Sequence, residues 1–187
     1  ASPLKLYDCC PFSDGASSVV LCSEKFAKAH GGDYVEVIGS GRGGSPAALQ
    51  GREHMTTIPS TKIAAKAAYD MAGITAKDVD FAEVHDCFTI AEVVDTEDLG
   101  FFGKGEGIQA IREDRTKLNS DISINPSGGL KSKGHPIGAT GVGQVVEVYD
   151  QLTGNAGART VKDAKIGLTH NFGATGASCA VHVFQSV

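Results

Sequence analysis

The chain has 187 residues and a formal net charge of −5, without a run of like charges, which argues against a nucleic-acid-binding surface and against a polybasic membrane patch. Hydrophobic residues make up 41% of the sequence, and no apolar run approaches the roughly 18 residues that a membrane-spanning helix requires. The five cysteines form no CxxC pair, so we predict neither a zinc site nor a disulfide framework, and we expect a reducing, cytoplasmic location without a signal peptide.

Residues 1–30 predict the end of a unit whose other parts lie outside this chain. Ala16 to Cys22 is small and β-branched, which favours a strand buried on both faces, and Glu24 to His30 is typical of a short helix closed by Gly31. The predicted strand has no earlier strand to pair with. The cysteines of this segment are interpreted as small core residues: Cys9, Cys10 and Cys22.

From Asp33 onward, strand and helix patterns alternate. The predicted elements, in chain order, are a strand over 34–38, a Gly-rich connection over 39–51, a helix from Pro59 that Gly73 stops, a strand over 79–84, a helix that ends at Leu99, a polar surface excursion over 101–121, a strand over 121–124, a helix that begins near Gly138, a turn over 155–159, a strand over 164–169, a Gly-rich bend over 170–176 and a last strand over 178–184. This order predicts an α/β fold with a mixed sheet flanked by helices, in which the last two strands are antiparallel.

Two local patterns in this part of the chain need an interpretation. The Gly-rich connection contains a Gly-x-Gly-Gly pattern that resembles a phosphate-binding loop, but no Lys-Ser or Lys-Thr follows, so the signal for a phosphate site is weak. Arg42 and Arg52 are therefore interpreted as surface charges. In the helix from Pro59, helical spacing predicts an inward apolar face: Ile63, Ala64, Ala67, Ala68 and Met71.

The stretch from Asn125 to Gly141 is rich in glycine and carries a single histidine, His135. It runs directly into a helical pattern, so His135 is predicted near a helix N-terminus, whose positive end disfavours a protonated imidazole and keeps the ring available as a base. The glycines allow the backbone to approach a ligand closely. The alternative is that His135 fills a gap in a Gly-rich turn.

Polar residues stand at three predicted strand ends, the positions at which α/β sheets place their ligands: 85–87, 134–136 and 170–173. Cys87 is predicted in the first turn of a helix, which would lower the pKa of its thiol, although a buried, inert cysteine is the alternative. Asp86 is interpreted as the N-cap of that helix. Gly173 offers a backbone N–H of the kind that an oxyanion hole uses.

These motifs together resemble the thiolase family. The sequence NPSGGLKSKGHPIGATG over 125–141 is very similar to the GHP loop of thiolases, and HDCF at 85–88 with HNFG at 170–173 is similar to thiolases of the sterol-carrier-protein type and their archaeal relatives. The resemblance covers essentially the whole chain. It implies a thiolase-like layered fold, with the tail of the thiolase N-terminal domain over 1–30 and the C-terminal domain over 31–187.

The resemblance also implies roles for individual residues. His135 would activate a nucleophilic cysteine and help to line an oxyanion hole, and His85 stands where most thiolases have an asparagine that positions an oxyanion-stabilising water. Cys87 would take the acid–base duty that most thiolases give to the cysteine of a CxG motif, because Asn171 occupies that position here. The backbone N–H of Gly173 would serve a second oxyanion hole. Contacts with the CoA part of the substrate are expected from four residues: Phe88, Ser127, Gly128 and Gly129.

The function that the resemblance implies is one half of an acyl-CoA acyltransferase, similar to acetyl-CoA C-acetyltransferase. CoA thioesters would be the substrates, and no metal or redox cofactor is expected. The nucleophilic cysteine would come from an N-terminal thiolase half, and the complete enzyme would be a homodimer or tetramer. The alternatives are a non-catalytic subunit that binds acyl-CoA or a partner chain, and a related steroid-type aldolase.

Overall fold

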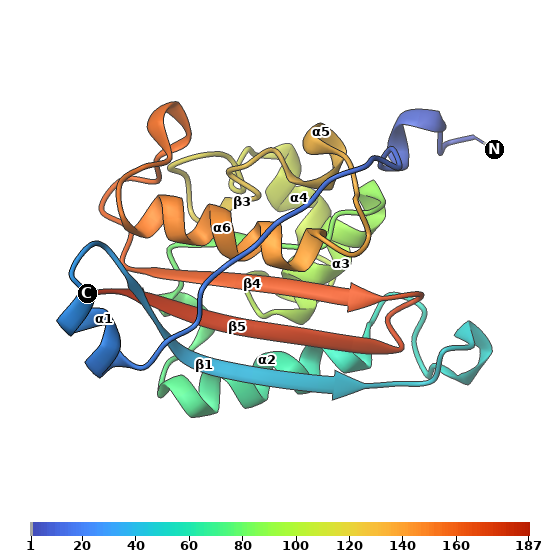
Figure 1. Cartoon of the computed structure of the whole chain (residues 1–187). Coiled ribbons are helices and arrows are strands. Elements are labelled where there is room, and N and C mark those ends of the chain that lie inside the picture. The colour runs from blue at the N-terminus through green and yellow to red at the C-terminus, as the bar shows by residue number, and fades with distance from the viewer. Residues whose placement is uncertain (1) are drawn as a thin grey trace.

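The computed structural model describes residues 2–187 and contains one mixed sheet, with the strand order β1-β5-β4-β2-β3 (Figure 1). β1 and β4 each pair antiparallel with β5, whereas β2 pairs in parallel with β4 and β3. The strands are β1 (Val35–Gly44), β2 (Phe81–Glu83), β3 (Ser123–Ile124), β4 (Ile166–Gly173) and β5 (Ser178–Ser186). The helices are α1 (Glu24–His30), α2 (Pro59–Ala72), α3 (Thr89–Asp98), α4 (Gly107–Arg112), α5 (Gly129–Lys133) and α6 (Thr140–Leu152). The predicted α/β class and the antiparallel last strand pair are confirmed.

Helices cover both faces of the sheet (Figure 1). α2 packs against β1 and β5 on one face, and α6 packs mainly against β4 and β2 on the other. Successive residues of a strand point to opposite faces, so neighbours in β2 belong to different cores. Phe81 packs with Val148 of α6, whereas Ala82 belongs to the larger cluster that contains Ala64 of α2.

The predicted Gly-rich connection is wrong in its first part, because residues 39–44 continue β1. Three glycines of this strand face α2: Gly39, Gly41 and Gly43. A Cβ atom at Gly41 would lie 2.0 Å from the carbonyl oxygen of Ala64, so only glycine allows the helix backbone to come this close. The alternating glycines are therefore a packing surface for α2.

The inward face predicted for α2 is also wrong in part. Ile63 is 52% exposed and Met71 is 67% exposed, whereas the fully covered positions belong to smaller side chains: Ser60, Thr61, Ala64, Ala65 and Ala68. The reason is the glycine surface of β1, because a helix that touches a strand backbone has no room for large side chains between them. Helical spacing predicted the existence of the helix correctly but not its rotation.

The strand predicted over 16–22 is absent from the structure, in which these residues run as extended, mostly exposed chain across α6 (Figure 1). Among the described residues, no strand pairs with them. Val20 is 89% exposed and Leu21 is 81% exposed. Cys9 and Cys22 are exposed, so their interpretation as core residues is wrong, and Cys10 is only partly buried.

Three further differences between the predicted and the observed elements lie in glycine-rich parts of the chain. β4 continues to Gly173, so the first half of the predicted bend over 170–176 is strand, and the turn follows over 174–177. α4 lies within the predicted surface excursion, and α5 lies inside the long loop. α6 begins at Thr140, two residues after the predicted start.

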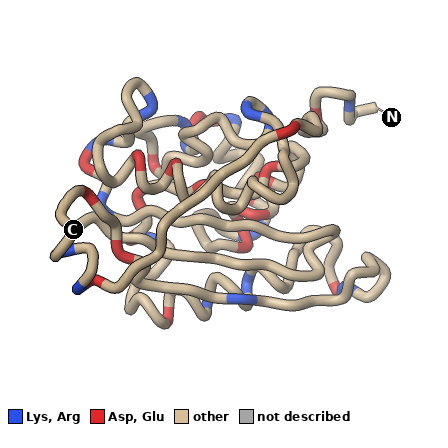
Figure 2. Tube along the Cα trace, viewed as in Figure 1, with Lys and Arg blue, Asp and Glu red and all other residues tan. Residues whose placement is uncertain are grey.

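Within residues 2–187, no helix is long and apolar enough to cross a lipid bilayer. Figure 2 shows acidic and basic residues interspersed along the helices and loops, while the long strands β1, β4 and β5 carry few charges.

Candidate active site

The ends of β2 and β4 lie side by side, because the two strands are parallel neighbours with Glu83 opposite Thr169. His85 lies two residues beyond the end of β2, and its ring centroid lies 4.6 Å from that of Phe172 near the end of β4. The ring of His135, from the loop between α5 and α6, lies 5.0 Å from that of His85 in an edge-to-face arrangement. The structure therefore brings together the three stretches that the sequence indicated as candidate sites.

The N-terminal segment holds two of these stretches. The backbone N–H of Cys10 donates to the carbonyl oxygen of Cys87 at 3.0 Å, and the N–H of His135 donates to the carbonyl oxygen of Pro11 at 2.9 Å. Consecutive residues of one segment thus connect the stretch after β2 to the histidine loop. This role of Cys10 and Pro11 could not be predicted, because no local sequence pattern indicates a contact between residues so distant in the chain.

His85 is a buried, neutral imidazole. Only 5% of its surface is exposed, and burial lowers its pKa to about 4, with a smaller contribution from the nearby His135. Its Nδ1 lies 3.1 Å from the side-chain nitrogen of Asn171, in β4. At neutral pH this ring therefore carries one proton and can act as a neutral hydrogen-bond donor.

His135 is partly buried, and its hydrogen bonds identify its tautomer. Its Nδ1 lies 2.7 Å from the hydroxyl of Thr140, and that hydroxyl donates its single hydrogen to the carbonyl oxygen of Pro136 at 3.1 Å. With the hydroxyl hydrogen on Pro136, the hydroxyl accepts from Nδ1–H, and this tautomer leaves Nε2 with a free lone pair. Burial lowers the pKa of His135, against the opposing charge of Asp86. The lowered pKa was predicted, but burial is its main cause, because α6 begins only at Thr140.

The lowered pKa predicted for Cys87 is wrong. α3 begins at Thr89 with Phe88 as its N-cap, so the thiol lies outside the first helical turn. Cys87 is 9% exposed, and burial raises its pKa to about 12, with further contributions from Asp95 and other acidic neighbours. Cys87 is therefore a neutral thiol at physiological pH.

Asp86 caps a different helix from the one predicted. Its carboxylate accepts from the backbone N–H groups of Leu130 at 2.7 Å and Lys131 at 3.3 Å, at the start of α5. Gly129 has a φ of +63°, and a Cβ atom there would lie 2.3 Å from this carboxylate. The contact attaches the histidine loop to the end of β2, and it requires glycine at position 129.

The residues predicted to contact CoA have clear local contacts in this fold. The N–H and hydroxyl of Ser127 donate to the two carboxylate oxygens of Glu83 at 3.0 and 2.6 Å. Gly128 is the left-handed N-cap residue of α5. Phe88 is 51% exposed beside Cys9, with which it forms an isolated β-bridge. Binding of CoA by these residues stays a prediction.

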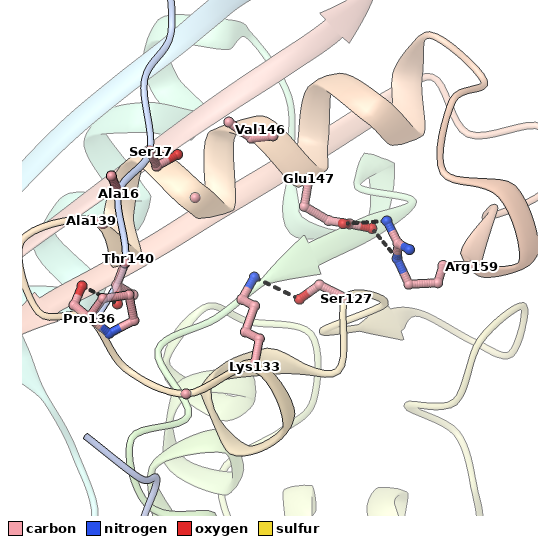
Figure 3. Close-up of a pocket in the computed structure, with 13 residues that line it drawn as sticks. Ala16, Ser17, Ser127, Lys133, Pro136, Ala139, Thr140, Val146, Glu147 and Arg159 are labelled. Atoms are coloured by element: carbon pink, nitrogen blue, oxygen red, sulfur yellow. Dashed lines mark hydrogen bonds and ion pairs between the residues drawn. The ribbon is translucent and has the colours of Figure 1, made fainter. Parts of the chain in front are cut away.

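A pocket of about 360 Å³ lies beside His135, between the N-terminal segment, the loop over 127–136 and α6. Figure 3 shows Lys133 pointing across it towards Ser127, with Nζ and the hydroxyl 2.9 Å apart. Farther along, Arg159 pairs with Glu147 of α6. The charged side chains of this pocket are therefore paired with groups of the protein itself.

In the third stretch, over 170–173, some side chains belong to the core and others face the candidate site, because successive residues of β4 point to opposite faces. His170 is completely buried, with Nε2 2.9 Å from the hydroxyl of Thr61 and Nδ1 3.6 Å from a carboxylate oxygen of Asp95. Burial lowers the pKa of His170 to about 3. Asn171 instead points to His85, and Gly173 is exposed at the end of the strand.

Comparisons with known proteins point to one family. A family model described as "Thiolase C-terminal domain-like" matches residues 41–186. An acetyl-CoA acetyltransferase from Methanothermobacter thermautotrophicus is 48% identical over 185 residues, which cover 99% of this chain and 48% of that protein. An acetyl-CoA acetyltransferase from Methanocaldococcus jannaschii is 39% identical, over 99% of this chain and 49% of that protein.

Two more distant similarities extend this result. Human sterol carrier protein 2 is 38% identical, over 93% of this chain and 33% of that protein. Among solved structures, an Ltp2-ChsH2(DUF35) aldolase superimposes with a TM-score of 0.86 at 20% identity, over 100% of this chain and 48% of that chain; this likeness shows a shared fold alone. The chain spans about half the length of the archaeal relatives, at 48% and 49%.

Proposed function

The chain belongs to the family of thiolase C-terminal domains, and on that premise we propose that it supplies the acid–base and oxyanion-binding side of an acyl-CoA acyltransferase. The reaction is the joining of two acyl-CoA molecules, or the cleavage of a 3-oxoacyl-CoA by CoA. The observation that carries this proposal is the meeting of His85 and His135, 5.0 Å apart and both kept neutral by burial, at the end of β2 next to Cys87.

The two histidines have different roles in the proposed reaction. The free Nε2 of His135 takes the proton of the nucleophilic cysteine that the N-terminal half provides, so that the cysteine can accept the acyl group. His85 donates a hydrogen bond to the thioester oxygen when negative charge develops there, and the N–H of Gly173 stabilises the oxygen of the second step. A buried, uncharged donor suits this task because it needs no reorganisation of water.

Cys87 transfers the proton at the α-carbon. In the condensation, Cys87 first gives its thiol proton to the CoA thiolate that leaves when the nucleophilic cysteine is acylated. The resulting thiolate of Cys87 then removes the α-proton, and the enolate attacks the acyl group on the nucleophilic cysteine, whose thiolate leaves. In the reverse, thiolytic reaction the thiol of Cys87 returns the proton to the enolate. Burial holds Cys87 in the thiol form, which is the form that the thiolytic reaction requires at its start.

The complete enzyme joins this chain to an N-terminal thiolase half and forms a homodimer or tetramer. CoA thioesters are its substrates, with Phe88, Ser127, Gly128 and Gly129 near the CoA part, and no metal or redox cofactor takes part. The cytoplasm suits such an enzyme, because all five cysteines are free and the acid–base group is one of them.

The test uses the complete enzyme with Cys87→Ala. Condensation and thiolysis should fall by about 10²–10⁴-fold, the usual contribution of a general acid–base group. Transfer of the acyl group from acetyl-CoA to the nucleophilic cysteine, measured by mass spectrometry, should continue. Cys22→Ala, which removes an exposed thiol, is the matched control and should leave both steps unchanged.

His135→Ala should slow both half-reactions, because one imidazole serves both of them. If Cys87→Ala retains the wild-type condensation rate, the assignment of the acid–base group is wrong. If neither variant changes turnover, the chain acts as a non-catalytic subunit and the proposed function fails.

A further inference from the structure

A chain of hydrogen bonds from α6 reaches His85 from behind. It begins at Gln144, which is completely buried. The Nε2 of Gln144 lies 3.3 Å from the carbonyl oxygen of Glu83 and 3.0 Å from the carbonyl oxygen of His170. Carbonyl oxygens only accept, so the amide atom that faces both of them must be the NH2 group. This determines the orientation of the Gln144 amide and directs Oε1 to the other side.

The second member of this chain is Asn171. The Oε1 of Gln144 lies 3.2 Å from the side chain of Asn171, and since this oxygen only accepts, the facing atom of Asn171 must be Nδ2. The same Nδ2 lies 3.1 Å from Nδ1 of His85. An NH2 group has two hydrogens, and here one is available for each partner.

The ring of His85 therefore has to accept at Nδ1. With a single ring proton at neutral pH, that proton must lie on Nε2. His135 has the opposite arrangement, because the hydroxyl of Thr140 accepts from its Nδ1–H and leaves Nε2 unprotonated. The two neighbouring rings thus present different atoms: one an N–H, the other a lone pair.

We propose that Gln144 and Asn171 are positioning residues that hold His85 as the Nε2–H tautomer, so that His85 donates a hydrogen bond from Nε2 beside the ring of His135, which takes the proton of the nucleophilic cysteine. This inference rests on the proposed function and deepens it. The tautomer of each ring is selected by backbone carbonyl oxygens through one or two side chains, and the two histidines cannot exchange their roles.

The same hydrogen bonds explain why Gln144, a polar residue, is buried on α6. Leucine would fill the space of Gln144, but it would leave the carbonyl oxygens of Glu83 and His170 without this donor and Asn171 without its acceptor. Free rotation of the Asn171 amide would then allow its oxygen to face Nδ1 of His85, which stabilises the wrong tautomer.

The test changes the partner of His85 from a donor to an acceptor. In Asn171→Asp, a carboxylate faces Nδ1, so His85 should carry a proton on Nδ1. In the complete enzyme with ¹⁵N-labelled histidine, the ring nitrogens of His85 are assigned by their loss in His85→Asn. The wild type should show a protonated Nε2 and an unprotonated Nδ1, and Asn171→Asp should show a protonated Nδ1. Asn155→Asp, at an exposed asparagine, is the matched control and should leave the His85 signals unchanged.

The kinetic effect should appear in kcat. Losing one oxyanion-hole donor typically costs about 10²–10³-fold, and Asn171→Asp should show a loss of this size with little change in KM. Gln144→Leu should act in the same direction, because it removes the oxygen that accepts from Nδ2 of Asn171 and orients this amide.

Three results would overturn the proposal: a wild-type spectrum with the proton on Nδ1, an Asn171→Asp spectrum identical to that of the wild type, or a changed tautomer with an unchanged kcat. The wild-type spectrum needs no variant to fold and no turnover to be measured. Failure of the proposed function would instead appear in the Cys87→Ala assay, so the two failures are distinguishable.

Discussion

α2 and α6, which lie on the two faces of the sheet, bury different kinds of side chain. α2 buries small residues: Ser60, Thr61, Ala64, Ala65 and Ala68. α6 buries mostly polar ones: Thr140, Gln144, Glu147, Val148 and Gln151. Both helices lie against the same sheet, and both have apolar residues at helical spacing. The difference must therefore come from what each helix contacts.

α2 contacts the backbone of a glycine-rich strand, so its task is close packing, and its small side chains leave little space to fill. α6 contacts the ends of β2 and β4, where backbone carbonyl oxygens and the histidine rings need hydrogen-bond partners. Gln144 donates to the carbonyl oxygens of Glu83 and His170, and the hydroxyl of Thr140 bonds the ring of His135. One helix stabilises the sheet, and the other places the polar groups of the candidate site.

The outer sides of the two helices also differ. Val145, Val146 and Tyr149 of α6 line a groove of about 1000 Å³ together with the exposed apolar residues of the N-terminal segment. We expect the N-terminal half to cover this groove in the proposed complete enzyme. The outer side of α2 instead carries exposed ion-pairing residues such as Lys66 and Asp70.

The strongest test of the close-packed face is Gly41→Leu. Its Cβ would lie 2.0 Å from the carbonyl oxygen of Ala64, so α2 has to move away from β1. We expect a loss of more than about 4 kcal/mol in the free energy of unfolding, measured by denaturant titration. Gly44→Ala is the control, because the nearest atom to its Cβ is 3.9 Å away. If Gly41→Leu is as stable as the control, the role of the glycine surface is wrong.

Glu92 of α3 should make the stability of the protein depend on pH. Burial raises the pKa of Glu92, close to the candidate site in α3, from 4.5 to about 7. The native protein then binds a proton that the unfolded chain releases, so this stabilisation is fully present below pH 4.5 and is lost as the pH rises through about 7. Glu92→Gln resembles the protonated carboxyl, so its stability relative to the wild type should increase over this range by at most about 3 kcal/mol.

Denaturant titrations of both proteins at several pH values between about 4 and 8 measure this difference. Glu113→Gln, at an exposed glutamate, is the control for the same substitution on the surface. A Glu92→Gln effect that is constant with pH would mean that Glu92 is ionised in the folded protein.

Breaking one ion pair on each helix gives the smallest effects. The carboxylate of Glu147 on α6 is 8% exposed and accepts from Arg159 at 3.0 and 3.2 Å. Arg159→Met leaves this carboxylate with Gln151 as its remaining side-chain donor, and should cost about 1–2 kcal/mol. On α2, Lys66→Met breaks a pair that is 75% and 63% exposed, and should change stability by less than about 0.5 kcal/mol. Equal effects in thermal or denaturant unfolding would contradict the distinction between the two faces.

The sequence by itself determined the elements that have local signals. α2 begins at Pro59, where the missing N–H costs no helical hydrogen bond, and Gly73 ends it with a φ of +69°. The α/β order, the antiparallel last pair of strands and the three polar strand ends also follow from patterns within a few residues. The roles assigned to Cys87, His85, His135 and Gly173 stay predictions, although the structure brings their stretches together at one edge of the sheet.

Only the tertiary structure decided properties that depend on distant residues. The buried face of α2 is set by glycines in β1, and the protonation of Cys87 is set by burial beneath other elements and not by the start of α3. The tautomer of His85 depends on Gln144, a residue of another helix. Local spacing determines which backbone conformation a segment prefers, but burial and hydrogen-bond partners depend on what folds against it.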